Sequence, residues 1–444
     1  MIPELQALDA RPSVIRVPHQ IDVPLTDRIK RLIDTPAFRR LANISQLGLV
    51  SLVYPGATHS RFEHSLGVYR NTLLFVRKLQ QDANFVELVS EQDVEALVVA
   101  ALLHDIGHWP YCHPIEDIGL KTITRHEDVA ATILSGQQFT DLIDSDWSFD
   151  VSSLTRLIGN RPETDGEKVL CSIISGPIDV DKMDYLYRDS LHCGVPYGMN
   201  FDAPRLINSI CLNGNQDGIA ITPKGKTAAE MLVFARYVMF SEVYWHHAVR
   251  SATAMLQRAY YVFNLESENQ ISPTALSRLT DHSFTTTIAK AKSSGSAEPT
   301  HATDSADLIN GLFGPRRELF KRVLDYNAHQ NPEIYRQIAH QPYTKLVELG
   351  ERISQELTRV SNQTIQPNEI LIDAPPTGLE VQFKVEVNDG TNSDSLENIS
   401  PVVNALAKQQ FDDFVKRVRV FVHPRHRKTV DPKIVEESLR AILA

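Results

Sequence analysis

The chain has 444 residues, of which 42% are hydrophobic and 23% are charged, so it can bury one large core or several modest ones. Its formal net charge of −10 repels nucleic-acid phosphates at long range, and any site for an anionic ligand therefore needs a local concentration of positive charge. The four cysteines form no CxxC pair, which argues against a zinc ribbon, a thioredoxin motif or a disulfide framework. The N-terminus lacks a signal-peptide core and no membrane-length apolar run occurs, so we expect a reduced, soluble, cytoplasmic protein.

The first hundred residues alternate short extended segments with helices. Residues 14–26 are β-branched and interrupted by proline, which predicts an irregular hairpin or an extended arm. Residues 27–47 have helical spacing, with a break expected at Pro36. An apolar stripe predicts an amphipathic helix over 60–79, and the nearly all-apolar segment 91–106 predicts a buried helix.

Further along the chain, helices give way to a mixed pattern. The spacing predicts helices over 178–190 and 226–258, the second with one bend. A helical pattern covers roughly 307–360, and the segments 379–387 and 415–422 are strand candidates. The fold class we expect is therefore mainly α, with a helical core and a smaller α/β C-terminal region.

This pattern predicts three parts in the chain. Residues 1–280 form the helical core, and residues 281–306, rich in small polar side chains, form a linker or loop. Residues 307–444 form a mixed α/β region that serves oligomerisation or regulation.

Candidate metal ligands gather around one adjacent pair. His104 and Asp105 end the expected buried helix, where burying an aspartate is costly unless a partner compensates its charge. A divalent metal would compensate it, but the pair supplies only two ligands. His64 lies within a helix among apolar neighbours, and Asp181 begins another helix. Two nitrogens and two carboxylates suit manganese, iron, cobalt, nickel or zinc.

The density of histidines favours metal binding over a purely structural role for these residues. A lone histidine on an apolar helix is more often a core side chain than a ligand. Here His104, His108 and His113 fall within ten residues, and His126 follows them. Chance does not explain this clustering among sixteen histidines in the chain.

Four motifs in the order H…HD…D resemble the HD superfamily. They read HSRFEHSLGV, LLHDIGHWPYCH, RHE and IDVDKMDYLYRD. Over roughly residues 15–260 the chain is similar to the deoxynucleoside triphosphate triphosphohydrolases, which include bacterial dGTPases and the animal protein that pairs a SAM domain with an HD domain. The resemblance implies an HD-domain core and metal-dependent hydrolysis of deoxynucleoside triphosphates to a deoxynucleoside and triphosphate.

The resemblance also assigns residues around the reacting phosphate. It places one divalent ion (Mn, Fe, Ni, Co, Zn or Mg) on His64, His104, Asp105 and Asp181. It places Arg61 against the phosphates, which fits its i,i+3 spacing from His64 on one helical face.

The catalytic candidates implied by the resemblance are mostly histidines. His108, His113 and His126 match positions near the triphosphate and the leaving oxygen, and His126 matches the general acid. Glu116 stands where the family usually has an aspartate. The resemblance therefore does not identify the carboxylate that acts as the general base or orients a catalytic group.

The substrate-binding candidates lie mainly on the helix that begins near Asp181. By resemblance Lys182 contacts phosphate, Tyr185 packs against the sugar and Asp189 binds the 3′-hydroxyl. Gln46 matches another sugar contact, and Arg250 is a candidate for reaching the phosphates.

Several alternatives stay open. HD enzymes also act on monophosphates, cyclic nucleotides and guanosine tetraphosphate. A basic run over 416–428 in an acidic chain is consistent with nucleic-acid binding, which we do not favour, or with an anion site. The resemblance implies a homo-oligomer with a nucleotide effector, but residues 16–20 (RVPHQ) lack the acidic residue that helps relatives to read guanine. No membrane partner is expected.

Overall fold

The computed structural model describes residues 2–10, 13–265, 270–290, 301–361, 363–376, 384–408 and 415–443. These residues are mainly helical with small sheets, which confirms the predicted fold class. Contacts between residues group the chain into two units, each assembled from separate segments. The first comprises Met1–Trp109, Arg125–Met239 and Gln382–Lys408, and the second comprises Pro110–Thr124, Phe240–Val381 and Gln409–Ala444.

The first unit begins as the sequence predicts. Strands β1 (Val14–Val17) and β2 (Ile21–Pro24) form an antiparallel hairpin, preceded by α1 (Pro3–Ala10). The expected break at Pro36 separates α2 (Asp27–Ile33) from α3 (Pro36–Arg40). Proline occupies the first turn of α3, where its missing N–H costs nothing, and Thr35 caps the turn by accepting from the Phe38 N–H.

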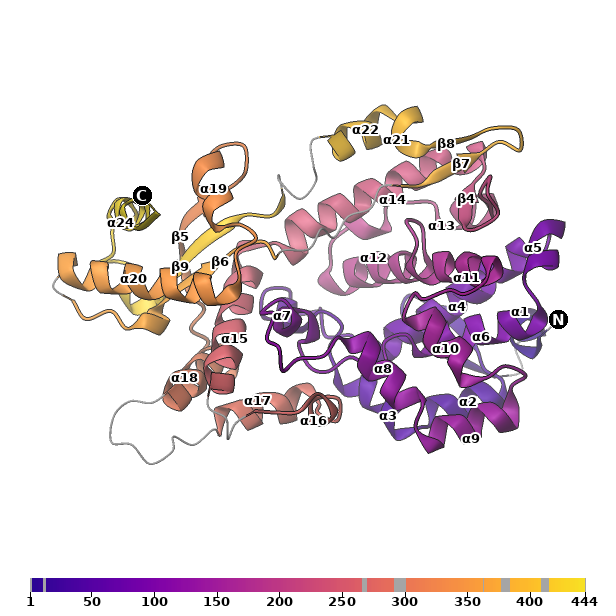
Figure 1. Cartoon of the computed structure of the whole chain (residues 1–444), viewed down its shortest axis with the longest axis horizontal. Coiled ribbons are helices and arrows are strands. Elements are labelled where there is room, and N and C mark those ends of the chain that lie inside the picture. Colours follow the sequence, from indigo (N-terminus) through magenta and orange to yellow (C-terminus); the bar gives the residue numbers. More distant parts are fainter. Residues whose placement is uncertain are drawn as a thin grey trace. The chain divides into compact units, whose positions relative to one another are not determined.

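Three helices form the part of the first unit that carries the motifs. Helix α4 (Arg61–Leu79) packs against both α6 (Glu91–Leu103) and α12 (Val180–Cys193), as Figure 1 shows. Helix α6 is buried without interruption from Val94 to Leu103, which explains its apolar character on every face. All three helices were predicted, and their termini lie within a few residues of the predicted bounds.

Further helices and a small sheet belong to the first unit. The helices are α5 (Ala83–Leu88), α8 (His126–Leu134), α9 (Gln137–Asp146), α10 (Val151–Ile158), α11 (Asp165–Ser175), α13 (Ala203–Ser209), α14 (Lys226–Met239), α21 (Leu396–Ile399) and α22 (Pro401–Lys408). The sheet has the order β3-β4-β7-β8, from Ile210–Leu212, Ile219–Ile221, Glu386–Asn388 and Ser393–Ser395. Strand β7 overlaps the last two residues of the strand expected over 379–387; residues 377–383 lie outside the described residues.

The second unit is built on the three-stranded antiparallel sheet β5-β9-β6 (Figure 1). Its strands are Lys321–Tyr326, Val418–Val422 and Ile370–Asp373, and its helices are α7 (Cys112–Glu116), α15 (His247–Leu265), α16 (Pro273–Leu276), α17 (Asp281–Ala289), α18 (His301–Phe313), α19 (Pro332–Ile338), α20 (Tyr343–Ser361) and α24 (Pro432–Leu443). Central β9 matches the strand predicted over 415–422. Strand β5 interrupts the helical pattern expected over 307–360, because it pairs with a segment about a hundred residues later that local periodicity does not reveal.

The structure agrees in part with the helix predicted over 226–258 and with the linker predicted over 281–306. The helix predicted over 226–258 is α14 followed by a π-helix at Phe240–Tyr244 and then α15, so the predicted interruption is present. Helices α17 and α18 occupy described parts of the expected linker over 281–306, and the three-part domain division stays a prediction. Among the described residues, no helix combines the length and apolar character needed to cross a membrane.

Candidate metal and phosphate site

The four predicted metal ligands converge in the first unit. His64 projects from α4, His104 and Asp105 follow the end of α6, and Asp181 lies in the first turn of α12. The Nε2 atom of His64 is 3.0 Å from Asp181 Oδ1 and 4.0 Å from Asp105 Oδ2. The Nε2 atom of His104 is 3.3 Å from Asp105 Oδ1 and 3.9 Å from Asp181 Oδ1. The donor atoms of three of them, His64, His104 and Asp105, lie within 4.8 Å of one another, which is the arrangement of a group that can hold a metal ion.

Hydrogen bonds on the far side of each imidazole fit metal ligation. His64 Nδ1 lies 2.8 Å from Asp184 Oδ2, and His104 Nδ1 lies 2.9 Å from the Ala101 carbonyl. If each Nδ1–H donates to these acceptors, the Nε2 atoms of both rings would be available to bind a metal ion in place of a proton. His104 Nε2 is buried without a hydrogen-bond partner in the described part of the chain, a cost that a metal would remove.

The electrostatics favour a cation at the same place. Burial alone would lower the pKa of His64, yet Asp181 and Asp184 outweigh burial and raise it to about 10. Burial alone would raise the pKa of Asp105, yet Arg61 and the nearby histidines hold it well below its usual range. The carboxylates therefore remain charged and attract positive charge, and two imidazoles with two carboxylates are a donor set that fits a divalent transition metal.

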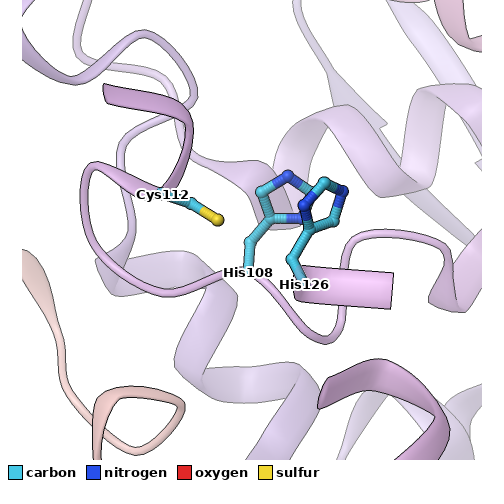
Figure 2. Close-up of side chains that lie close together, drawn as sticks. All are labelled: His108, Cys112 and His126. Atoms are coloured by element: carbon cyan, nitrogen blue, oxygen red, sulfur yellow. The ribbon is translucent and has the colours of Figure 1, made fainter. Parts of the chain in front are cut away.

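Arg61 and two further histidines border the ligand group. Arg61 Nη1 donates to Asp105 Oδ2 at 2.8 Å, while Arg61 Nε is buried without a hydrogen-bond partner among the described residues. His108 Nδ1 lies 3.1 Å from Asp105 Oδ1, and its ring centroid is 4.0 Å from that of His126. Figure 2 shows the two rings facing each other. Positively charged and proton-carrying groups thus lie beside the carboxylates.

Gly107 allows His126 to approach. A Cβ at Gly107 would lie 2.1 Å from the His126 carbonyl oxygen and 2.6 Å from the Ala130 amide nitrogen. The glycine that follows the HD pair therefore lets the N-terminus of α8 pack against the end of α6.

The predicted phosphate and sugar contacts lie on α12. Lys182 Nζ binds the N-cap residue Asp179 and donates to the Gly176 carbonyl. Burial raises the pKa of Tyr185, and nearby Arg236 of α14 acts against that rise. Arg236 also interacts electrostatically with Lys182, so two cations and a tyrosine lie together.

The sugar-contact candidates are linked by His59. Its Nε2 lies 2.9 Å from Asp189 Oδ1, and its carbonyl accepts from the Gln46 N–H at 3.0 Å. Gln46 Oε1 and His59 Nδ1 are buried without hydrogen-bond partners among the described residues. Buried polar atoms without partners are costly and are expected where a ligand supplies the missing hydrogen bonds.

Three predicted residues belong to the second unit. His113 and Glu116 lie on α7, 3.6 Å apart between Nδ1 and Oε2. Arg250 of α15 forms an ion pair with Asp373 and stacks over the Trp245 ring. Their catalytic and phosphate-binding roles stay predictions.

Sequence reasoning overlooked Asp184, His59 and Arg236. Asp184 carried one available signal, because it follows the ligand Asp181 by one helical turn on the same helix. His59 begins the motif HSRFEHSLGV, but nothing in its spacing links it to Asp189, and Arg236 lies in no quoted motif. Only the packing of distant segments brings these two residues to Asp189 and Tyr185.

Several cations of the basic run over 416–428 form ion pairs within the second unit. Arg417 and Arg419 both bind Asp325, at 2.9 and 3.1 Å, and Lys416 is buried. Arg425 and His426 both bind Glu369. These contacts support a structural role for the run and weaken the nucleic-acid interpretation.

Comparisons with known proteins match most of the chain to two families. Residues 61–175 match the HD domain family, and residues 201–440 match the family described as HD associated region. An uncharacterized protein of Methanocaldococcus jannaschii is 40% identical over 249 residues, covering 56% of this chain and 49% of that protein. The deoxynucleoside triphosphate triphosphohydrolase SAMHD1 of Bos taurus is 25% identical over 412 residues, covering 85% of this chain and 65% of that protein.

A solved structure shows the same fold over nearly the whole length. A hypothetical protein from Aquifex aeolicus superposes with a TM-score of 0.69 at 27% identity, covering 97% of this chain and 99% of that one. Among the curated relatives, the match is shorter: the chain spans about half the length of the first of them.

Proposed function

Because the chain belongs to the HD-domain family and carries that family's associated region, we propose that it hydrolyses deoxynucleoside triphosphates to a deoxynucleoside and triphosphate. Family membership supports a metal-dependent phosphohydrolase, and the bovine relative's name supports the narrower substrate class. The observation that carries the proposal is the convergence of the four metal-ligand candidates at the first turn of α12, the helix that also carries Lys182, Tyr185 and Asp189.

The ligand group would hold one divalent ion. His64 and His104 would supply Nε2 lone pairs, and Asp105 and Asp181 would supply carboxylate oxygens. Such an ion, when bound, polarises a phosphoryl oxygen and lowers the pKa of water. Which metal serves is a matter for elemental analysis of the purified protein.

The chain's own residues have separate tasks in the reaction. Arg61 and Lys182 bind phosphate oxygens and stabilise the charge that develops on the triphosphate. The oxygen of a water joins the α-phosphorus as the bond to the 5′-oxygen breaks. His126 holds the proton that passes to that 5′-oxygen, so that the deoxynucleoside leaves neutral.

The sugar contacts favour deoxyribose. Tyr185 packs beneath the sugar and leaves no space for a 2′-hydroxyl, while Asp189 binds the 3′-hydroxyl and Gln46 makes another contact with the sugar. The buried Oε1 of Gln46 has no hydrogen-bond partner among the described residues, which supports a contact between Gln46 and a ligand.

A nucleotide screen tests the proposal against other HD reactions. The protein would be incubated with Mn²⁺ and, separately, dATP, ATP, dAMP, cyclic AMP and guanosine tetraphosphate, and the products separated by ion-exchange chromatography. We expect dATP to yield deoxyadenosine and triphosphate, and to react faster than ATP. Faster hydrolysis of a monophosphate, a cyclic nucleotide or guanosine tetraphosphate would replace the proposed substrate with that one, and equal kcat/KM for dATP and ATP would remove the sugar argument.

A further inference from the structure

A buried chain of charged groups leads away from the metal-ligand candidate His64. Asp184 binds the His64 ring and forms two hydrogen bonds with Arg188, at 2.8 and 2.6 Å. Arg188 Nη1 reaches further and donates to Glu63 Oε1 at 2.6 Å. The side chain of Arg188 is only 1% exposed, so its two carboxylate partners are what compensate its charge.

A second set of contacts leads from Glu63 to the sugar-contact candidate Asp189. The same oxygen, Glu63 Oε1, lies 3.0 Å from His192 Nε2. The His192 ring stacks on the His59 ring, with centroids 4.3 Å apart and an interplanar angle of 18°. His59 Nε2 in turn lies 2.9 Å from Asp189 Oδ1. Glu63 therefore joins two arms, one ending at His64 and the other at Asp189.

The packing leaves these groups little freedom to move separately. A Cβ at Gly67 would lie 1.8 Å from Asp184 Oδ1 and 2.4 Å from Arg188 Nη2, so only glycine fits beside that ion pair. His59 and Asp189 have side chains 0% and 2% exposed. In a close-packed interior, a restraint on one member is passed to its neighbours rather than absorbed by empty space.

We propose that Glu63 is a positioning residue that couples metal binding at His64 to sugar binding at Asp189. A metal that fixes the His64 ring also fixes Asp184 and Arg188, and through Glu63 it restricts the side chains that hold Asp189. The 3′-hydroxyl then meets an ordered acceptor, and less conformational entropy is lost on binding. Linkage requires the reverse effect to be equal, so a bound sugar strengthens metal binding by the same factor. The inference rests on the proposed function, because it assumes that Asp189 contacts the sugar.

Deoxyadenosine is the probe that isolates this coupling. It has no phosphate, so it cannot contact a metal through a phosphate oxygen, and an effect of metal that depends on its 3′-hydroxyl passes through the protein. We would measure its dissociation constant by calorimetry in metal-free buffer and with saturating MnCl₂. We expect Mn²⁺ to tighten binding by about fivefold or more in the unsubstituted protein, the lower end of typical coupling between sites. Binding of 2′,3′-dideoxyadenosine, which lacks the 3′-hydroxyl, should show no such effect.

Two substitutions interrupt the chain of contacts at different places. Glu63→Gln keeps an oxygen that accepts from Arg188 and His192 but removes the charge. His192→Phe keeps a ring against His59 and leaves the pair of Arg188 with Glu63 intact. We expect the Mn²⁺ effect on deoxyadenosine binding to fall close to onefold in both variants, with Mn²⁺ affinity in the absence of nucleoside little changed in His192→Phe. The matched control is Glu163→Gln, whose side chain is 70% exposed on the same unit and which should keep the full effect.

The outcomes separate this inference from the proposed function. The coupling is overturned if Mn²⁺ does not change the dissociation constant of deoxyadenosine in the wild-type protein, or if both variants keep the full Mn²⁺ effect. The proposed function still holds in either case if the protein hydrolyses dATP. A protein that binds Mn²⁺ but neither binds deoxyadenosine nor hydrolyses dATP overturns the proposed function and the coupling with it.

Discussion

Asp181 bears on both the metal and the substrate assignments, because it lies beside His64 and in the first turn of the helix that carries Lys182. We expect Asp181→Ala to remove both the bound metal and the hydrolysis of dATP. Elemental analysis and the hydrolysis rate, each compared with Asp165→Ala on an exposed helix start, provide the check. Full metal occupancy in Asp181→Ala would show that Asp181 is not a ligand.

Asp184 tests whether a residue that orients a metal ligand affects metal binding as a ligand does. Its carboxylate orients the His64 ring and is itself held charged: burial alone would raise the pKa of Asp184, but Arg188 and His64 lower it to about 2. Asp184→Asn keeps the shape but loses the charge. We expect metal affinity to fall roughly 10–100-fold, the usual effect of losing a residue that supports a metal-bound histidine. A Mn²⁺ titration that gives the wild-type dissociation constant would contradict this role.

At the scale of the element, helix α4 depends on Gly67. The added methyl group of Gly67→Ala would overlap the ion pair of Asp184 with Arg188, although alanine is itself the better helix former. We expect the clash to dominate and the free energy of unfolding to fall by about 1–3 kcal/mol, with weaker Mn²⁺ binding. Urea unfolding compared with Gly218→Ala, where a Cβ meets nothing closer than 3.5 Å, measures the effect. An unchanged midpoint and unchanged metal affinity would show that the pair can move aside.

The local sequence pattern predicted the helices that carry the ligands. Apolar residues indicate α4 and α6, and α12 contains a recognisable motif. It failed for β5, whose burial comes from pairing with β9 rather than from its own sequence. The same limit applies within the site. The ligands stand in recognisable motifs, whereas Arg236 of α14 stands in none and lies near Lys182 and Tyr185 only because α14 and α12 pack together.

At the scale of the whole molecule, the resemblance predicts a homo-oligomer and a nucleotide effector. Arg16, in the segment where relatives read guanine, is donor-only and pairs with Asp22 at 2.8 Å. In the basic run over 416–428, Arg417 and Arg419 pair with Asp325, and Arg425 and His426 pair with Glu369. We therefore expect GTP to activate dATP hydrolysis weakly or not at all, with light scattering reporting mass in the same samples. Strong activation by GTP alone, at concentrations where other nucleotides do nothing, would contradict this.

The central claim is that water attacks the α-phosphorus of a deoxynucleoside triphosphate in a site built on the HD ligands. Hydrolysis of dATP in ¹⁸O-labelled water, with Mn²⁺ present and the products analysed by mass spectrometry, tests it most directly. The account predicts unlabelled deoxyadenosine and triphosphate that carries one ¹⁸O atom. Release of labelled orthophosphate or of pyrophosphate with dAMP, or ¹⁸O in the deoxyadenosine, would contradict it.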